Sequence, residues 1–390
     1  MRILFTFAGG SGHGEPLIPI ARAAQVAGHT VAFGCQPKMI PMVESAGFAA
    51  FATGGDTLGT PKRLPLLALD AEREDRALRV GFAGRIARDR AAKVVALCAA
   101  WRPDLIVCDE IDFGSMIAAE KVGTLYATVL VIAAGSFVRD VVVAEPLNQL
   151  RAAHGLPPDP ALAMLRRYLV LSPGPPSYRD PAFPLPPTAH AIRPVALDPR
   201  EGNPFPPWLA NLDGAPAVYF SLGTVFNVES GDLFGRVLAG LRDLPINVVV
   251  TVGHEIDPAE LGPQPANVRV ERYVPQALLL PHCRLVVSHG GSGSVIGALA
   301  HGLSMVLIPM GADQPLNAAR CDALVVAKVL DAVTATPESV RDAVFSVLTG
   351  PGYQRNAERL RDEIATLPGP AHAVRLLERL AAEKRPLVSA

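Results

Sequence analysis

The feature of the sequence best suited to chemistry is a turn at residues 289–294, which reads HGGSGS. It follows a short apolar run, CRLVVS, and precedes a run with helical apolar spacing, VIGALAHG. Its glycines let a ligand approach backbone N–H groups, its serines and histidine add donors, and a helix start favours negative charge. A merely flexible turn is the alternative. This composition favours an anion-binding turn of the kind that holds phosphate.

A second candidate lies near the start of the chain, where residues 9–16 read GGSGHGEP after the apolar run RILFTFA. The loop superficially resembles a dinucleotide fingerprint, but Glu15 occupies the place of the last glycine. The next strand-like run, HTVAFGCQ, also lacks an acidic residue at its end for a ribose. A nicotinamide enzyme is therefore a poor fit. The residue of this loop that could still take part in chemistry is His13. Its imidazole is poised near neutral pH to accept a proton from a hydroxyl.

Acidic residues follow a third apolar run, PDLIVCD at residues 103–109. A carboxylate at Asp109 could orient a histidine and stabilise its protonated form, or it could cap the helix that FGSMIAAEKVG predicts. Asp112 is a rival for the first role. On its own, a histidine in a turn such as that of His13 more often serves a local hydrogen bond. The Asp-x-x-Asp spacing suits a helix cap better than a metal site, so we predict no metal.

The runs that carry these residues predict two parallel α/β domains with a cleft between them. Strands are expected in RILFTFA, HTVAFG, PDLIVCD and TLYATVLVI, and then in AVYFSLGT, INVVVTVG, NVRVERYVP, CRLVVSHGG and SMVLIPMG. From residue 171 to 216, proline density predicts no regular helix or sheet. We expect an N-terminal Rossmann-like domain over 1–200, a linker over 201–215, a second domain over 216–370 and a C-terminal helix over 371–390.

Composition limits the class of protein. Lys and Arg number 36 against 37 Asp and Glu, with no basic stripe, which argues against a nucleic-acid partner. No apolar run reaches the ~20 residues that a membrane span needs, and the start of the chain is too short for a signal region, so we expect a cytoplasmic protein. The five cysteines lack metal-ligand spacing and are expected to be inert core thiols. The charged stretch from Asp70 to Lys93 predicts a solvated helix face without chemistry.

The segment at residues 272–321, RYVPQALLLPHCRLVVSHGGSGSVIGALAHGLSMVLIPMGADQPLNAARC, resembles the donor-binding box of the UDP-glycosyltransferase superfamily. It is most similar to actinobacterial members that glycosylate natural products such as antibiotics and polyketides. The resemblance implies an α/β architecture of the GT-B type, with two Rossmann-like doubly wound domains facing a cleft. It also implies that Gly12-His13-Gly14-Glu15-Pro16 matches a Gly-His-x-x-Pro loop in which the histidine, His13, is the catalytic base. Asp109 matches the carboxylate that orients this base in an inverting dyad.

The same resemblance implies a donor site in the second domain. The YVPQ segment would hold the nucleobase and ribose, with its tyrosine where many relatives carry a stacking tryptophan. The HGGSGS and SLGT turns would hold the diphosphate, and the DQ pair would hydrogen-bond the sugar. Without the resemblance, SLGT could equally be an ordinary strand-end turn. The implied donor residues are Ser221, Thr224, Tyr273, Val274, Gln276, His289, Gly291, Ser292, Gly293, Ser294, Asp313 and Gln314.

One departure from the family pattern bears on the nucleotide. Plant relatives that use UDP-sugars usually carry a glutamate eight residues beyond the motif histidine, where it holds the ribose hydroxyls. Here that position is Gly297. A 2′-deoxyribose would not need the carboxylate, so we hypothesise a TDP-linked sugar, with UDP as the alternative.

The sequence thus predicts a metal-independent, inverting glycosyltransferase that moves a sugar, expected to be a deoxyhexose, to a hydroxyl of an apolar aglycone in antibiotic biosynthesis. The nucleotide diphosphate-sugar is a co-substrate, so no cofactor is expected. A nucleotide-sugar epimerase and a non-catalytic helper protein of the same fold are the alternatives. The GHxxP loop and the DQ pair disfavour the first, and His13 with Asp109 disfavours the second. The acceptor-binding residues stay undefined, and oligomeric state stays open, with a homodimer as one outcome.

Overall fold

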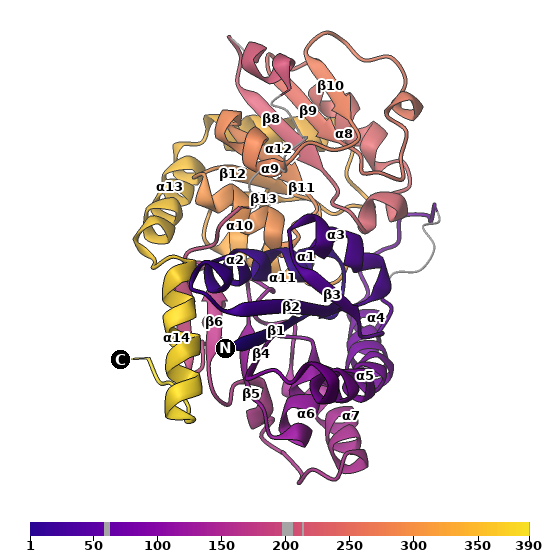
Figure 1. Cartoon of the computed structure of the whole chain (residues 1–390). Coiled ribbons are helices and arrows are strands. Elements are labelled where there is room, and N and C mark those ends of the chain that lie inside the picture. Colours follow the sequence, from indigo (N-terminus) through magenta and orange to yellow (C-terminus); the bar gives the residue numbers. More distant parts are fainter. Residues whose placement is uncertain (58–62, 197–205, 213, 390) are drawn as a thin grey trace. The chain divides into compact units, whose positions relative to one another are not determined.

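The structure is a computed structural model that describes residues 1–57, 63–196, 206–212 and 214–389. The chain divides into two compact units, each with its own core (Figure 1). The first comprises Met1–Gly59, Ala71–Val195 and Leu367–Ala390, and the second comprises Thr60–Asp70 and Ala196–Thr366. Within the predicted linker over 201–215, residues 201–205 and 213 lie outside the described residues.

The first unit is built on a parallel sheet of seven strands in the order β3-β2-β1-β4-β5-β6-β7. Its strands are β1 (Arg2–Thr6), β2 (Thr30–Cys35), β3 (Ala49–Ala52), β4 (Leu105–Asp109), β5 (Leu125–Val129), β6 (Val170–Pro173) and β7 (Ala189–Ile192). The central strands β1 and β4 are almost wholly buried apolar runs, as expected for a sheet covered on both faces. Their carboxyl ends therefore lie side by side at one edge.

Helices connect these strands. They are α1 (Ser11–Gly14), α2 (Ile18–Val26), α3 (Ile40–Ser45), α4 (Ala71–Arg76), α5 (Ala87–Trp101), α6 (Phe113–Val122) and α7 (Asp140–Ala153). Short 3-10 turns are η1 (Glu15–Leu17), η2 (Pro37–Met39), η4 (Ala163–Leu165) and η5 (Pro176–Tyr178), and η3 (Ala77–Ile86) is a π-helix between α4 and α5. The C-terminal helix α14 (Pro370–Glu383), yellow in Figure 1, packs on α2 and completes this unit.

The second unit contains a parallel sheet of six strands in the order β10-β9-β8-β11-β12-β13. Its strands are β8 (Ala217–Ser221), β9 (Asn247–Thr251), β10 (Val268–Glu271), β11 (Leu285–Ser288), β12 (Ser304–Leu307) and β13 (Ala327–Val329). Its helices are α8 (Leu233–Leu241), α9 (Gln276–Leu279), α10 (Ser292–Ala300), α11 (Gln314–Ala323), α12 (Pro337–Thr349) and α13 (Pro351–Thr366). Its 3-10 turns are η6 (Pro207–Asn211), η7 (Phe226–Glu229), η8 (Pro258–Leu261) and η9 (Leu280–His282).

A segment from the first half of the sequence also belongs to the second unit. The Leu64 N–H donates to the Val228 carbonyl at 2.9 Å, and Leu66 packs against the core of that unit. Gly231, at φ +53°, approaches this segment closely, because a Cβ there would lie 3.2 Å from the Leu66 nitrogen. The loop between β3 and α4 thus contributes apolar surface to the second core.

Two parallel α/β sheets confirm the predicted fold class, and two local predictions are wrong. Regular structure does occur between 171 and 216, because β6 ends at Pro173 and the edge strand β7 spans Ala189–Ile192. Proline is tolerated at strand ends and in edge strands, where no ladder hydrogen bond is lost. The stretch from Asp70 to Lys93 is not wholly solvated either, because Arg90 on α5 is fully buried.

Candidate functional site

His13 and Asp109 meet at the carboxyl edge of the first sheet. The carboxylate ends β4, and the histidine lies on the short helix α1 that follows the neighbouring strand β1. The His13 Nδ1 atom lies 3.3 Å from Asp109 Oδ2. The Asp109 side chain is fully buried, whereas a quarter of the His13 side chain is exposed. This arrangement leaves the imidazole able to meet a ligand while its inner nitrogen faces the carboxylate.

The protein holds the Asp109 carboxylate in one orientation. Its Oδ2 accepts a hydrogen bond from the Ala8 N–H at 2.9 Å, and its Oδ1 accepts one from the Ile111 N–H at 2.8 Å. Burial raises the pKa of Asp109, and the hydrogen bond to His13 is the largest opposing influence. A carboxylate held in this way fixes the histidine tautomer and stabilises an imidazolium.

Asp112, the rival carboxylate, has different partners. Its Oδ1 accepts a hydrogen bond from the Ser115 N–H and thereby caps α6, and both of its oxygens accept bonds from the buried Arg90 guanidinium at 2.5 and 2.7 Å. Arg90 also donates to Thr53 Oγ1. Of the two carboxylates, Asp109 is therefore the one that faces the His13 ring. Asp112 instead forms a buried ion pair with Arg90.

In the second unit, His289 follows β11 and is buried between two glycines. A Cβ at either Gly223 or Gly291 would lie 2.6 Å from His289 Nε2, and Gly223 has φ +78°. Burial lowers the pKa of His289 to about 4, against the opposing influence of Asp313. The imidazole is therefore neutral at physiological pH and offers an N–H donor without a charge.

The turn after His289 is tied to helix α11 by a buried asparagine. Asn317 Nδ2 donates to the Gly290 carbonyl at 3.0 Å, to Ser292 Oγ at 3.0 Å and to Asp313 Oδ2 at 2.8 Å. Ser292 Oγ also donates to Asp313 Oδ2 at 2.6 Å. These bonds argue against the merely flexible turn. Asn317 was not among the predicted residues; its only sequence signal is its place four residues after Asp313 on one helix.

The outer part of the turn is open. Gly293 is exposed, and a Cβ there would meet nothing within 4 Å; Ser294 is half-buried. On the adjacent strand β8, Ser221 is buried and its Oγ accepts a bond from the Gly223 N–H at 3.3 Å, while Thr224 is exposed. Strands β8 and β11 pair directly, so both turns lie at one edge of this sheet.

The DQ pair begins helix α11 at the same edge. Asp313 is half-buried and is held by Ser292 and Asn317. Gln314 is buried, and its Oε1 accepts a hydrogen bond from the Met310 N–H at 2.8 Å. The oxygen of the Gln314 amide is thus hydrogen-bonded to the backbone of its own unit.

The YVPQ segment follows β10 in this unit and ends at Gln276, the first residue of α9. Tyr273 is half-exposed and stacks on His254, with ring centroids 5.4 Å apart, whereas Val274 is buried. Gln276 is half-buried and hydrogen-bonds the Tyr219 side chain. A Cβ at Gly297 would lie 3.4 Å from Gln276 Oε1, which places the position without the family glutamate beside the predicted ribose contact.

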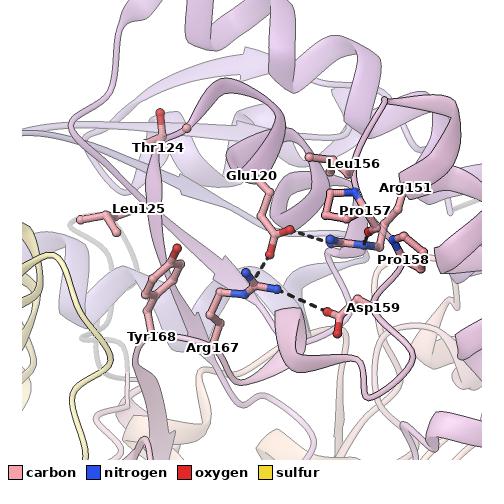
Figure 2. A pocket seen from close by; sticks show the side chains of 11 residues that line it. Glu120, Thr124, Leu125, Arg151, Leu156, Pro157, Pro158, Asp159, Arg167 and Tyr168 are labelled. Carbon is pink, nitrogen blue, oxygen red and sulfur yellow. Dashed lines mark hydrogen bonds and ion pairs between the residues drawn. The ribbon is translucent and has the colours of Figure 1, made fainter.

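A pocket of about 320 Å³ lies elsewhere in the first unit (Figure 2). Its lining includes Thr124 and Leu125 at the amino end of β5, so it lies at the edge of the sheet opposite to Asp109. Glu120 pairs with Arg151 at 2.6 Å and with Arg167 at 3.2 Å. The charges of this pocket satisfy one another, as Figure 2 shows, and the pocket contains no residue of the two candidate sites.

In the parts of the chain that the structure describes, no group of three or more His, Cys, Asp or Glu side chains is arranged to hold a metal ion. Over those same residues, no helix is both long enough and apolar enough to cross a bilayer.

The known proteins to which this chain is similar are sugar transferases and an antibiotic-biosynthesis family. Residues 235–380 match the family model "Erythromycin biosynthesis protein CIII-like, C-terminal domain". The chain is 30% identical to tylactone mycaminosyltransferase of Streptomyces fradiae, over 99% of this chain and 93% of that protein. It is 28% identical to TDP-daunosamine transferase DnrS of Streptomyces peucetius, over 99% and 98%. The crystal structure of the glycosyltransferase SnogD from Streptomyces nogalater matches with a TM-score of 0.78 and 25% identity, over 98% of this chain and 99% of that one.

Proposed function

The chain belongs to the actinobacterial antibiotic glycosyltransferases of the GT-B fold, and we propose that it transfers a deoxyhexose from a TDP-sugar to a hydroxyl of an apolar aglycone, with inversion at the anomeric carbon. Relatives named for mycaminosyl and TDP-daunosamine transfer support the donor class. The observation that carries the catalytic part of the proposal is the His13–Asp109 pair, with 3.3 Å between the ring nitrogen and the carboxylate.

In the proposed reaction, His13 acts as the base. The acceptor hydroxyl loses its proton to the imidazole as its oxygen attacks the anomeric carbon. The new carbon–oxygen bond forms on the face opposite the bond to the diphosphate, which breaks with its electron pair going to the leaving TDP. The Asp109 carboxylate stabilises the imidazolium that results.

The charge on the leaving diphosphate is met in the second unit. Helix α10 begins at Ser292, so the N–H groups of its first turn and the positive end of its dipole point toward the turn. The neutral His289 ring and the open backbone at Gly293 add donors that need no rearrangement during the reaction. This scheme requires no metal ion. Asp313 and Gln314 are proposed to bind the sugar hydroxyls, and Ser221 and Thr224 to close over the phosphates.

The nucleobase and ribose are proposed to lie against Tyr273, Val274 and Gln276. The half-exposed Tyr273 ring offers a face for stacking. At Gly297, beside Gln276, no carboxylate is present to bind a ribose 2′-hydroxyl. This absence supports a thymidine nucleotide.

The catalytic assignment is tested by His13→Ala. We expect transfer to fall by about 10²-fold to 10⁴-fold, as the loss of a general base does, while the Kd for TDP measured by calorimetry stays unchanged. Release of TDP that depends on added acceptor separates transfer from epimerisation and from a helper role. Full transfer activity in the variant would refute the base assignment.

The donor assignment has its own test. Mass spectrometry of products from paired TDP- and UDP-sugars, offered with a panel of apolar aglycones, should show preferential use of the TDP form. A strong preference for UDP would overturn the interpretation of Gly297. His13→Ala serves as the inactive control for the products.

A further inference from the structure

Behind His13 lies a buried glutamine that the proposed reaction does not use. Gln36 follows strand β2 at the same edge of the sheet and is 1% exposed. Its Nε2 donates to the Gly9 carbonyl at 2.6 Å and to Thr57 Oγ1 at 2.9 Å. Its Oε1 accepts a hydrogen bond from the Thr57 N–H at 2.9 Å.

These partners fix the orientation of the Gln36 amide. Rotating the amide by half a turn would place its oxygen against the Gly9 carbonyl and its NH₂ group against the Thr57 N–H. Both contacts would be repulsive, and the buried groups would be left without partners at a cost. The side chain therefore presents a donor to Gly9 in a single arrangement.

Gly9 in turn forms the surface on which the His13 ring lies. Its φ of +136° is in the region that favours glycine, and a Cβ there would lie 2.4 Å from His13 Cδ2. The residue before it, Ala8, donates its N–H to Asp109 Oδ2, the oxygen that faces His13 Nδ1. The loop under the imidazole is thus held at two successive residues, by Asp109 at the Ala8 N–H and by Gln36 at the Gly9 carbonyl.

We propose that Gln36 is a positioning residue for the base: by holding the Gly9 carbonyl, it keeps the His13 ring against Asp109 and its Nε2 available to the acceptor hydroxyl. The inference rests on the proposed role of His13. It assigns a catalytic effect to a side chain that does not touch the reacting atoms. Displacement of a catalytic group by about 1 Å can cost about 10²-fold in rate, so a hydrogen bond that fixes its support is sufficient to matter.

Two substitutions test the proposal. Gln36→Glu keeps the size and the acceptor for the Thr57 N–H but replaces the donor to Gly9 with an oxygen, and Gln36→Met keeps the volume without either interaction. We expect kcat to fall about 10-fold to 10²-fold in both, with no change in the Kd for TDP, because the donor residues lie in the other unit. The long-range ¹H–¹⁵N NMR spectrum of the His13 ring should shift in both variants, a change that a purely structural role would not produce.

A control and a double variant complete the test. Tyr126→Phe removes buried hydrogen bonds to the Met164 carbonyl and to Glu120 at the opposite edge of the same sheet, and it should leave kcat unchanged. Combining Gln36→Glu with His13→Ala should add no loss beyond that of His13→Ala. Wild-type kcat and an unshifted His13 spectrum in folded Gln36 variants would overturn the positioning role while leaving the base intact. An active His13→Ala variant would instead overturn the base assignment itself.

Discussion

Two buried ionisable residues at the candidate sites lie in different surroundings. The Asp109 carboxylate accepts two backbone N–H bonds and faces the His13 ring, so a charge on it is compensated. His289 is buried between glycines, and burial lowers its pKa to about 4. A carboxylate in this position suits the stabilisation of an imidazolium, and a neutral imidazole can donate its one N–H to a diphosphate oxygen.

The lowered pKa of His289 predicts a pH dependence of stability. Between pH 6.5 and about 4 the unfolded histidine binds a proton that the folded one does not. Stability is therefore retained above pH 6.5, falls as pH decreases through this window, and reaches its full loss below about 4. A shift of this size corresponds to about 3 kcal/mol. Urea unfolding of the second unit at pH 7.5 and pH 4 should show this loss in the wild type.

The control for this prediction is His289→Asn, which removes the titrating group from a similar volume. Other acid effects are common to both proteins, so the difference between them isolates His289. The wild type should lose about 3 kcal/mol more than the variant on acidification. Equal losses in the two proteins would show that His289 titrates in the folded state as it does in the unfolded chain.

Residue types indicated the chemistry at these sites, but not the residues that hold them. His13, Asp109 and His289 stand out because each ends or follows a strand in a glycine-rich or acidic context. Arg90 and Asn317 do not stand out. Arg90 looks like one charge among many on α5, and only the fold shows that it pairs with Asp112, 22 residues away. Such long-range pairings leave no local pattern.

At the scale of elements, we expect a single methyl group added at Gly223, in the turn between β8 and η7, to weaken donor binding. In Gly223→Ala, the new Cβ would meet His289 Nε2 at 2.6 Å, and the φ of +78° would be strained for alanine. We expect the affinity for TDP to fall by about tenfold or more, since each ~1.4 kcal/mol is tenfold. Calorimetry with TDP measures this directly.

Gly235→Ala is the matched control in the same unit. It lies on an exposed position of α8, and a Cβ there meets nothing within 4 Å. The substitution should raise stability by up to about 1 kcal/mol through helix propensity and leave TDP affinity unchanged. Wild-type affinity in Gly223→Ala would mean that the two glycines do not confine the His289 ring.

The sequence predicted the strands that form clear apolar runs, and it missed β3, β6, β7 and β13. Strands β1, β4, β8, β9 and β11 coincide with apolar runs whose composition is typical of buried parallel strands. Strands β6, β7 and β13 have only three or four residues, and β6 and β7 lie among prolines. These strands form because a neighbouring strand supplies their hydrogen bonds. That pairing belongs to the tertiary structure and leaves no local pattern in the sequence. The glycine-rich turns were found because their φ requirements are local.

At the scale of the whole molecule, the chain passes between the two units more than once. The loop after β3 contributes Leu66 to the second core, and the last helix, α14, returns to the first unit (Figure 1). Neither feature could be predicted from the sequence, because an amphipathic helix has the spacing of apolar residues but not the identity of the surface that it covers. Each compact unit therefore combines stretches that are separate in the sequence.

This passage of the chain predicts a selective effect of C-terminal truncation. A chain that ends at residue 366 lacks the apolar side chains by which the terminus is buried in the first unit, namely Val374, Leu376, Leu377, Leu380 and Leu387. At about 1.5–3 kcal/mol each, their loss is on the order of 10 kcal/mol, comparable with the whole stability of a domain. We expect the first unit to unfold and transfer to be lost, while calorimetry still detects TDP binding by the second unit.

The control is a chain that ends after Leu387. It keeps the Leu387 N–H bond to the Tyr168 carbonyl, and we expect its thermal stability and its transfer rate to equal those of the wild type. If the shorter chain kept its full transfer rate and thermal stability, α14 would be an appendage and not a part of the first core.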